Sequence, residues 1–269
     1  RKIGEIWGYE TDGYYTINDF NADDAKHKTW TLKEGVVKIN GYNPQPGDVK
    51  FKDLRTDGVI NAGDNTVDNP GDRKIIGNDA ARYQFGISLG ASYKGWSLEV
   101  LLQGVGKRDY WLGGPAMFPF GGAGAGDAVF QALYANQTDY WRAKSYDPSS
   151  SDYMVPVNPD SKLFRIYDQG NNVGSNTRVS DKYLQNAAYM RIKNITLAYT
   201  LPKEWVKRAF IQDAKFYLSV ENLATFSSLP KGYDPEGTAP SSTANALSNG
   251  ISWGYPYYRT ISLGASITF

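Results

Sequence analysis

The sequence predicts an all-β protein whose strands are built to cross a membrane. Apolar and polar residues alternate with a period of two along five segments. Most of these segments hold about 10–13 residues, whereas strands of soluble proteins usually hold about 5–6. Short and long connections alternate between them, as in transmembrane β-barrels. A soluble sandwich or lipocalin-like barrel with long strands also fits the alternation, but not the repeated long connections on one side.

The first two segments, 82–93 and 96–106, are predicted to form a hairpin. Odd positions from Tyr83 to Tyr93 are apolar, and even positions are polar or small. After the short turn at Lys94-Gly95 the alternation resumes at Trp96, with Leu101 as the one apolar residue on the polar face. Two residues between alternating runs are typical of a tight hairpin.

The remaining three strands are predicted at 189–200, 214–223 and 257–269. The last is the most regular, because odd positions to Phe269 are mostly apolar and even positions are polar or small, apart from Tyr258. A short helix is expected at Lys203–Phe210. Aromatic residues gather near strand ends, which is typical of the girdles of outer-membrane barrels.

The long connections, 107–188 and 224–256, both fall on one side of the predicted sheet. If the C-terminus is periplasmic, these two segments and residues 1–81 lie outside the cell. The turn at 94–95 and the connection 201–213 then lie in the periplasm. Five strands cannot close a barrel, and an open sheet edge in hydrocarbon leaves backbone groups without hydrogen bonds. We therefore expect an incomplete barrel that pairs with strands elsewhere.

Composition excludes several functional classes. The 269 residues carry 29 Lys and Arg against 28 Asp and Glu, a net charge of +1, so no general attraction to nucleic acid is expected. There is no Cys and one His, His27, which excludes Cys-ligated metals, Cys nucleophiles and sites with two His ligands. No catalytic constellation is evident, so we expect no enzyme. The mean hydropathy of −0.49 reflects alternation and polar loops.

Residues 53–64 resemble a calcium-binding loop. Such a loop places oxygen ligands at defined positions around a central Gly, here Gly58. Arg55 replaces one ligand by a cation, so a turn without metal is the alternative. We expect no required cofactor, and Ca²⁺ is the metal that this loop would bind. The candidate ligands are Asp53, Asp57, the Val59 carbonyl, Asn61 and Asp64.

Three pairs of aromatic residues lie in the predicted outer segments. Beside polar side chains they are suited to stacking on sugar rings or to contact with a lid protein. The alternative is that they pack the loops. The pairs are Tyr110 with Trp111, Tyr140 with Trp141, and Trp253 with Tyr255.

Several short motifs occur in order from end to end of the chain. They are WGYETDG (7–13), GDVKFKDL (47–54), DRKIIGN (72–78), YKGWSL (93–98), YMRIKNITLAY (189–199), ENL (221–223) and GYDPE (232–236). Together they resemble motifs of the SusC/RagA-type TonB-dependent outer-membrane transporters of the Bacteroidota. Segment 189–199 is similar to the pattern YLRLKNITLGY of that family, and 232–236 matches its GYDPE.

This resemblance implies the C-terminal strands of a 22-stranded antiparallel barrel in the outer membrane. It implies import of a bulky nutrient, a glycan or an oligopeptide. The implied partners are a SusD-like surface lipoprotein as lid, TonB-ExbB-ExbD acting on a plug that this chain lacks, the remaining barrel, and the lipid bilayer. Phe269 resembles the terminal aromatic residue read by the barrel-assembly machinery. A soluble, calcium-dependent carbohydrate-binding β-protein is the alternative.

Overall fold

The computed structural model describes residues 2–21, 30–112, 117–118, 133, 135–166, 173–231, 233–237 and 257–269. These residues fall into two compact units. Unit 1 is formed by described residues of 2–79 and 110–185, and unit 2 by those of 80–109, 186–237 and 257–269. The segments 1–81 and 107–188, which the sequence suggested as separate outer regions, thus share one unit for most of their length. Buried hydrophobic side chains from both segments pack together in one core. The period-two alternation of apolar residues does not predict this packing.

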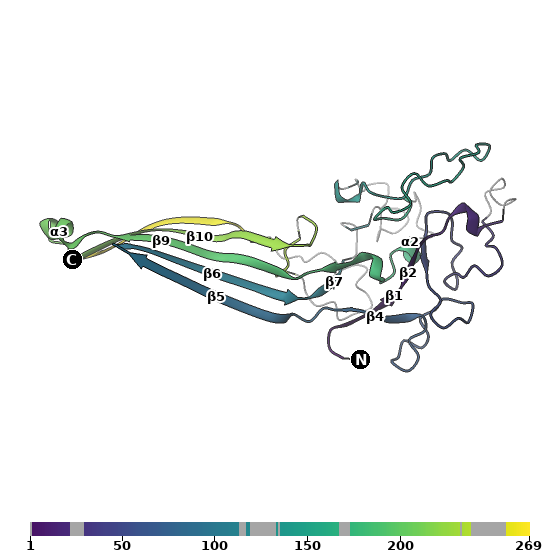
Figure 1. Cartoon of the computed structure of the whole chain (residues 1–269), viewed down its shortest axis with the longest axis horizontal. Coiled ribbons are helices and arrows are strands. Elements are labelled where there is room, and N and C mark those ends of the chain that lie inside the picture. The colour runs from purple at the N-terminus through teal and green to yellow at the C-terminus, as the bar shows by residue number, and fades with distance from the viewer. Residues whose placement is uncertain are drawn as a thin grey trace. The chain divides into compact units, whose positions relative to one another are not determined.

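Unit 2 holds one antiparallel five-stranded sheet (Figure 1). Each strand pairs with the next strand of the sheet along the chain, in the order β11-β10-β9-β6-β5. The bounds of β5 and β9 coincide with the predicted ranges, whereas β10 continues past residue 223 and β11 begins three residues later than predicted, at 260 rather than 257. The strands are β5 (Arg82–Tyr93), β6 (Trp96–Lys107), β9 (Tyr189–Thr200), β10 (Asp213–Ser227) and β11 (Thr260–Thr268).

The register of the sheet gives it one apolar and one polar face. Side chains directly opposite one another share a face, so each cross-strand ladder can be followed through all five strands. One apolar ladder consists of Ala91, Leu98, Leu197, Leu218 and Leu263.

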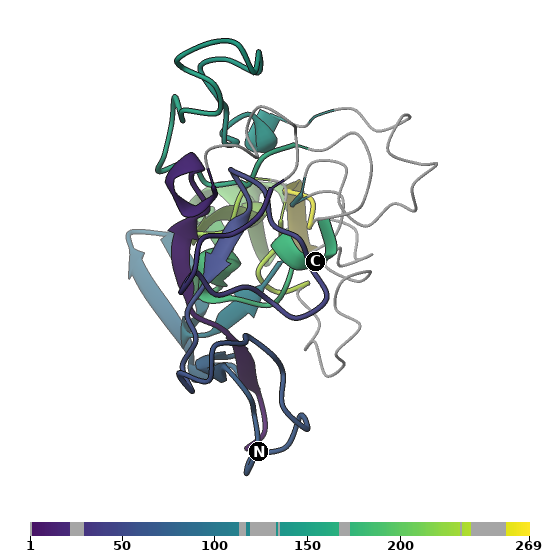
Figure 2. The ribbon, with the colours of Figure 1, turned by 90° about the vertical axis from the view of Figure 1, so that its right-hand side faces the viewer.

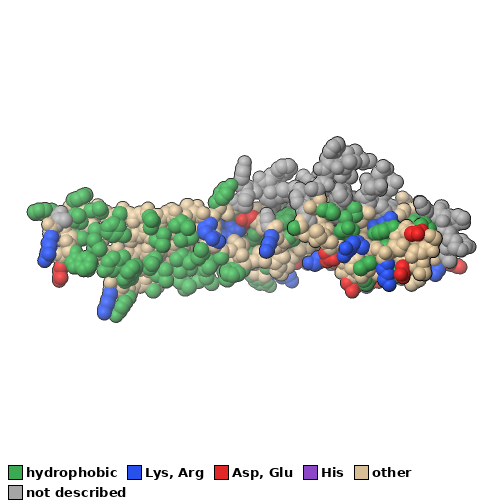
Figure 3. All heavy atoms as spheres, turned by 90° about the horizontal axis from the view of Figure 1, so that it is seen from above, with side chains coloured by type: hydrophobic (Ala, Val, Ile, Leu, Met, Phe, Trp, Pro, Cys, Tyr) green, Lys and Arg blue, Asp and Glu red, His purple; other side chains and the backbone are tan. Residues whose placement is uncertain are grey.

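A polar ladder runs one residue along, on the opposite face. It consists of Gly90, Glu99, Thr196, Ser219 and Ser262. The side of the strands seen in the space-filling view carries many hydrophobic side chains (Figure 3).

A β-bulge interrupts this pattern in β9 at Lys193, where the register shifts against both neighbouring strands. In the matching irregularity of β10, Asn222 has a left-handed backbone with φ of 51°. A shift of one residue moves all following side chains to the other face. Arg191 and Ile195, which strict alternation places together, therefore lie on opposite faces, and Arg191 lies opposite Gln103 on the polar face.

The short connections meet at one end of the sheet. The amide of Thr200 donates a hydrogen bond to the carbonyl of Gly95, and the amide of Gln212 donates one to the carbonyl of Thr268. The helix expected at 203–210 is present as α3 (Lys203–Val206) followed by a 3-10 turn, η5 (Lys207–Ala209). Figure 1 shows α3 beside the C-terminus.

Gly264 explains how a large ring fits on the polar face. A Cβ atom at this position would lie 2.2 Å from Cζ of Tyr217, its cross-strand neighbour. Glycine therefore leaves the space that the tyrosine ring occupies.

Unit 1 is built from short strands around an aromatic core. β1 (Glu5–Tyr9) pairs with β4 (Arg73–Asn78), and β2 (Thr11–Tyr14) pairs with β3 (Val49–Phe51). Figure 2 shows the N-terminus beside the pair formed by β1 and β4. The core residues are Tyr9, Tyr14, Ile39, Val49, Phe51, Ile60, Trp111, Phe118, Trp141, Ala143, Met154, Leu163, Phe164 and Tyr183.

The other elements are short. In the described part of the chain, none of the helices is long and apolar enough to span a membrane. These elements are β7 (Asp109–Trp111), β8 (Leu184–Asn186), α2 (Val173–Asn176) and the 3-10 turns η1 (Ile17–Asp19), η3 (Ala135–Gln137) and η4 (Asp181–Tyr183).

Candidate functional site

The apolar face of the unit 2 sheet is an exposed hydrophobic surface that all five strands share. Its side chains are open to the surroundings: Leu263 is 84% exposed and Leu89 is 55% exposed. β5 has 12 residues, an extended length of about 40 Å, which at the tilt of about 45° found in barrels covers the roughly 30 Å of a bilayer core. A continuous apolar surface of this kind is unfavourable in water and favourable in lipid.

Aromatic rings mark one end of this face. Tyr93, Trp96 and Tyr199 occupy neighbouring positions of one cross-strand row. The rings of Trp96 and Tyr199 lie 4.7 Å apart, and Lys94 Nζ lies 5.2 Å from the centre of the Tyr93 ring. Aromatic and basic residues together are typical of the level at which hydrocarbon gives way to headgroups.

The polar face carries a small hydrogen-bond network. Asn194 Nδ2 donates to Ser219 Oγ at 2.9 Å, and Thr196 Oγ1 donates to Asn194 Oδ1 at 2.8 Å. The Thr196 and Ser219 hydroxyls lie 3.0 Å apart. A face that satisfies its own polar groups in this way suits the water-filled or plugged interior of a barrel.

A cluster of ion pairs lies on the polar face at the other end of the strands. Arg191 is 2% exposed, and its Nη2 donates to both carboxylate oxygens of Asp234 at 2.8 Å. Its Nη1 lies 3.2 Å from Glu236, which also accepts a hydrogen bond from Lys193 Nζ at 2.7 Å. Buried charges require such compensation, because the desolvation penalty of an unpaired ion is large.

Neutral groups complete the cluster around Arg191. Its Nε donates to Thr225 Oγ1 at 2.7 Å, and its guanidinium lies 5.0 Å from the centre of the Tyr257 ring. Arg108 Nη1 donates to the Pro235 carbonyl at 3.3 Å. Together these contacts fix residues 233–237 against the polar face of β9.

Sequence reasoning identified the motifs that contain this cluster but assigned no role to their charges. The bulge at Lys193 hides the arrangement, because it places Arg191 on a face that alternation does not predict. The available signal was the pairing of two basic residues in one motif, Arg191 and Lys193, with two acidic residues in another, Asp234 and Glu236.

The calcium-like turn is held together by its own hydrogen bonds. Asp53 Oδ2 accepts from the amide of Gly58 at 2.8 Å, and Asn61 Oδ1 accepts from Gly63 at 2.7 Å. Burial raises the pKa of Asp53, but backbone N–H donors, Gly58 first among them, outweigh it and leave the pKa below its ordinary value.

Other candidate ligands of this turn are also engaged. Asp57 Oδ1 accepts from the amide of Val59 at 3.1 Å, and Asp64 Oδ2 accepts from Asn69 Nδ2 at 2.8 Å. Across the described ranges, no group of three or more His, Cys, Asp or Glu side chains is placed to hold a metal. Calcium binding by this turn stays a prediction.

Asp72 organises the same turn, although the sequence did not single it out for this role. Its carboxylate is fully buried and accepts hydrogen bonds from the amides of Leu54, Arg55 and Asn61. Asp72 lies outside the range of the calcium-like pattern, so only the folded chain reveals the contact.

The structure places several of the candidate contact aromatics in the core of unit 1. Tyr110, Trp111 and Trp141 are buried, and Trp111 and Trp141 are members of the core cluster. Their burial supports the alternative reading, that these rings pack the loops. Tyr140 is half-buried against the same core. The last pair, residues 253 and 255, lies outside the described residues.

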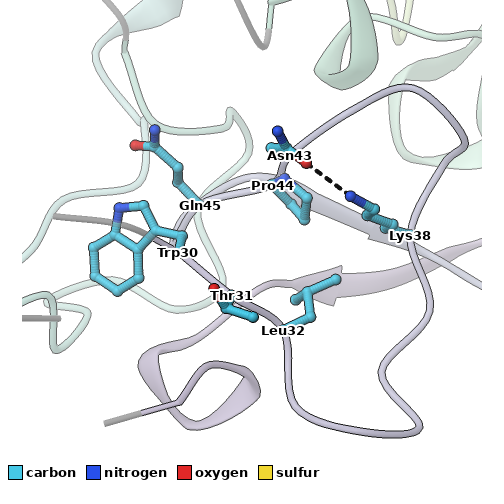
Figure 4. A pocket seen from close by; sticks show the side chains of 7 residues that line it. All are labelled: Trp30, Thr31, Leu32, Lys38, Asn43, Pro44 and Gln45. Carbon is cyan, nitrogen blue, oxygen red and sulfur yellow. Dashed lines mark hydrogen bonds between the residues drawn. The ribbon is translucent and has the colours of Figure 1, made fainter. Parts of the chain in front are cut away.

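A hollow of about 580 Å³ opens in unit 1, within the size range of small-ligand sites (Figure 4). Trp30 stands at one side, with its ring held 5.2 Å from Phe20 and 6.0 Å from Tyr153. Across from it, Lys38 Nζ donates to Asn43 Oδ1 at 2.7 Å. The lining residues are Trp30, Thr31, Leu32, Lys38, Asn43, Pro44 and Gln45.

The fold and its two-faced sheet define a class: a segment of the wall of an antiparallel transmembrane β-barrel. No protein-family model matches the chain. The structure of the RagAB peptide importer in its open-open state has the same fold over 98% of this chain and 22% of that chain, with a TM-score of 0.50 and 19% identity.

Sequence comparison narrows the class. The chain is similar to the TonB-dependent receptor P3 of Formosa agariphila, with 26% identity over 99% of the chain. It is also 24% identical to the TonB-dependent receptor P26 of the same organism, over 90% of the chain. The chain spans about 22% of the length of both relatives. It is thus related to the TonB-dependent receptors, and the resemblance to the SusC/RagA type is confirmed.

Proposed function

We propose that this chain forms part of the barrel wall of a TonB-dependent importer in the outer membrane. The observation that carries the proposal is the apolar face shared by all five strands of unit 2, with a polar face behind it. Such a sheet suits lipid on one side and a transport channel on the other. The relatives are named receptors, which supports a role in uptake and not in catalysis.

The cargo that we propose is a bulky nutrient, either a glycan or an oligopeptide. Parts of the protein outside this chain would supply the other strands and the plug on which TonB-ExbB-ExbD acts. A SusD-like surface lipoprotein would cover the outer side. RagAB, which shares the fold, is a peptide importer, and this supports the oligopeptide class by analogy.

Uptake by cells tests this function directly. Deletion of the protein should abolish uptake of one class among fluorescent oligosaccharides and oligopeptides, and deletion of TonB should have the same effect. A strain complemented with the intact protein is the control. Unchanged uptake of every probe after deletion would contradict the proposal.

Calcium remains a separate proposal for residues 53–64. Isothermal titration of the purified protein with Ca²⁺ tests it, and the variant Asp53→Asn with Asp57→Asn is the control that should lose any binding. Calcium-dependent glycan binding by a protein that stays monodisperse without detergent would instead favour the soluble carbohydrate-binding alternative.

A further inference from the structure

The α3–η5 turn of unit 2 presents two aromatic side chains that pack against little else. Trp205 is 65% exposed and Phe210 is 92% exposed. Val206 between them is buried, and the amide of Ile211 donates to its carbonyl at 3.2 Å. The turn is therefore anchored through Val206 while both rings project away from the chain.

Phe210 has a backbone conformation that ordinarily favours glycine. Its φ of 61° lies in the left-handed region, directly after the 3-10 turn. A bulky residue in this region is strained, and here the ring gains almost no contact within the chain in return. Contact with something outside the chain would explain a large apolar side chain at this position.

The same turn carries cations that have no ion-pair partner among the described residues. They are Lys203, Lys207 and Arg208, and one acidic residue, Glu204, lies among them. At the opposite end of the sheet, by contrast, Arg191 and Lys193 are paired with carboxylates. The turn thus offers positive charge to an external anion.

The turn also lies next to the aromatic row of the sheet. Thr200, whose amide bonds to Gly95, directly follows Tyr199, and Gly95 directly precedes Trp96. The exposed rings of the turn therefore lie near the end of the apolar face that the aromatic row marks. Exposed aromatic rings beside Lys and Arg are the combination that anchors proteins at a membrane interface.

We propose that the α3–η5 turn docks into the lipid leaflet at this end of the sheet. Trp205 and Phe210 enter the boundary between headgroups and hydrocarbon, and the three cations bind phosphate oxygens of the headgroups. The occupant is lipid because the charge is complementary and the surface is continuous with the membrane-facing sheet. This inference rests on the proposed function, since it requires unit 2 to lie in a bilayer.

Spin labelling of the whole protein tests the inference. The chain contains no Cys, so a label at Phe210→Cys is unique within it. The protein is reconstituted into nanodiscs of phosphatidylcholine, with or without phosphatidylglycerol. Collision rates with oxygen and with a water-soluble nickel chelate report whether the label is in lipid or in water. We expect a lipid signal that is strengthened by phosphatidylglycerol.

Charge variants measure the headgroup contribution. Each single change, Lys203→Gln, Lys207→Gln or Arg208→Gln, should shift the equilibrium of the label toward water by about fivefold in phosphatidylglycerol discs. The variant Lys162→Gln, an exposed cation of unit 1, should have no effect. An unchanged label environment in all three turn variants would overturn the role of the cations.

Two further labels separate the possible failures. A label at Leu263→Cys on the apolar face should be in lipid, and a label at Ser151→Cys in unit 1 should be in water. If the label at 263 is in lipid but the label at 210 is in water, the docking proposal fails and the barrel proposal stands. If the label at 263 is also in water, the barrel proposal itself fails. If the label at 210 is shielded from the water-soluble nickel chelate in whole envelopes but not in nanodiscs, a protein partner covers it. This result would also overturn lipid docking.

Discussion

The two units use the same aromatic and aliphatic residue types in opposite ways. In unit 1, Trp141 is 1% exposed and lies within an aromatic core. In unit 2, Trp96 is 51% exposed and lies on the open face of a sheet. Unit 1 buries its apolar side chains against one another, as a protein in water must. Unit 2 turns them outward, which is stable only where the surrounding solvent is itself apolar.

The first way to test this contrast is to remove a core ring from unit 1. Trp141→Ala should lower the local stability of unit 1 by about 3–5 kcal/mol, because it removes a fully buried side chain and leaves a cavity. Hydrogen exchange of the amide at position 141, which donates to the Leu163 carbonyl, provides the measurement. Val157→Ala at an exposed site is the control, and an equal effect of both changes would contradict the assigned core.

The second test places a charge on each face of unit 2. Leu263→Arg should cost about 2–4 kcal/mol, because the guanidinium would lie in hydrocarbon, whereas Ser262→Arg on the polar face should cost much less. Denaturant titration of the protein assembled in lipid vesicles measures both. An equal loss of stability in the two variants would contradict the assignment of Leu263 to the lipid-facing side of the sheet.

The third test concerns the ion pairs of unit 2. Arg191→Met should destabilise the protein by about 3 kcal/mol, since it leaves the carboxylate of Asp234 without its counterion, whereas Glu236 keeps its contact with Lys193. Limited proteolysis at residues 233–237 should become faster. Arg191→Lys retains the charge but not the paired geometry, so its stability and its rate of proteolysis should lie between those of wild type and Arg191→Met. Unchanged proteolysis in both variants would show that the cluster does not hold this segment.

The smallest expected effect is a pH dependence confined to unit 1. Hydrogen bonds from Lys52 and Lys74 hold the pKa of Glu10 at about 2, below its reference value of 4.5. Because the folded pKa is lowered, the stabilisation is complete above pH 4.5 and is lost as the pH falls toward about 2. The melting temperatures of wild type and of Glu10→Gln should therefore converge as the pH falls through this interval. Parallel melting profiles down to pH 2 would refute the assigned contacts.

The sheet of unit 2 was largely predictable from the sequence. Strands β5 and β9 have the predicted bounds because β5 alternates along its length and β9 alternates from Asn194 onward. A turn ends β5 at Lys94-Gly95, and a Pro follows Leu201 after β9. Strand β10 is longer than predicted, because the bulge at Asn222 breaks the alternation without ending the strand.

The organisation of unit 1 was not predictable in the same way. Its strands β1 to β4 hold three to six residues, too few to show a period. Sequence alone does not distinguish an aromatic ring that is buried in a core, such as Trp141, from one that is exposed and contacts a ligand. The role of Asp72 depends on contacts with three amides distant in the chain, which local patterns do not encode.

The bulge at Lys193 has a consequence for how this chain tolerates insertions and deletions. Between Asn194 and Thr200, an added residue would exchange the lipid-facing and polar side chains along the rest of β9. At Lys193 the strand already accommodates one unpaired residue. A change of length there therefore alters the size of the bulge and leaves residues 194–200 in register with the neighbouring strands. Variation in length among relatives is therefore expected to concentrate at this point of the strand.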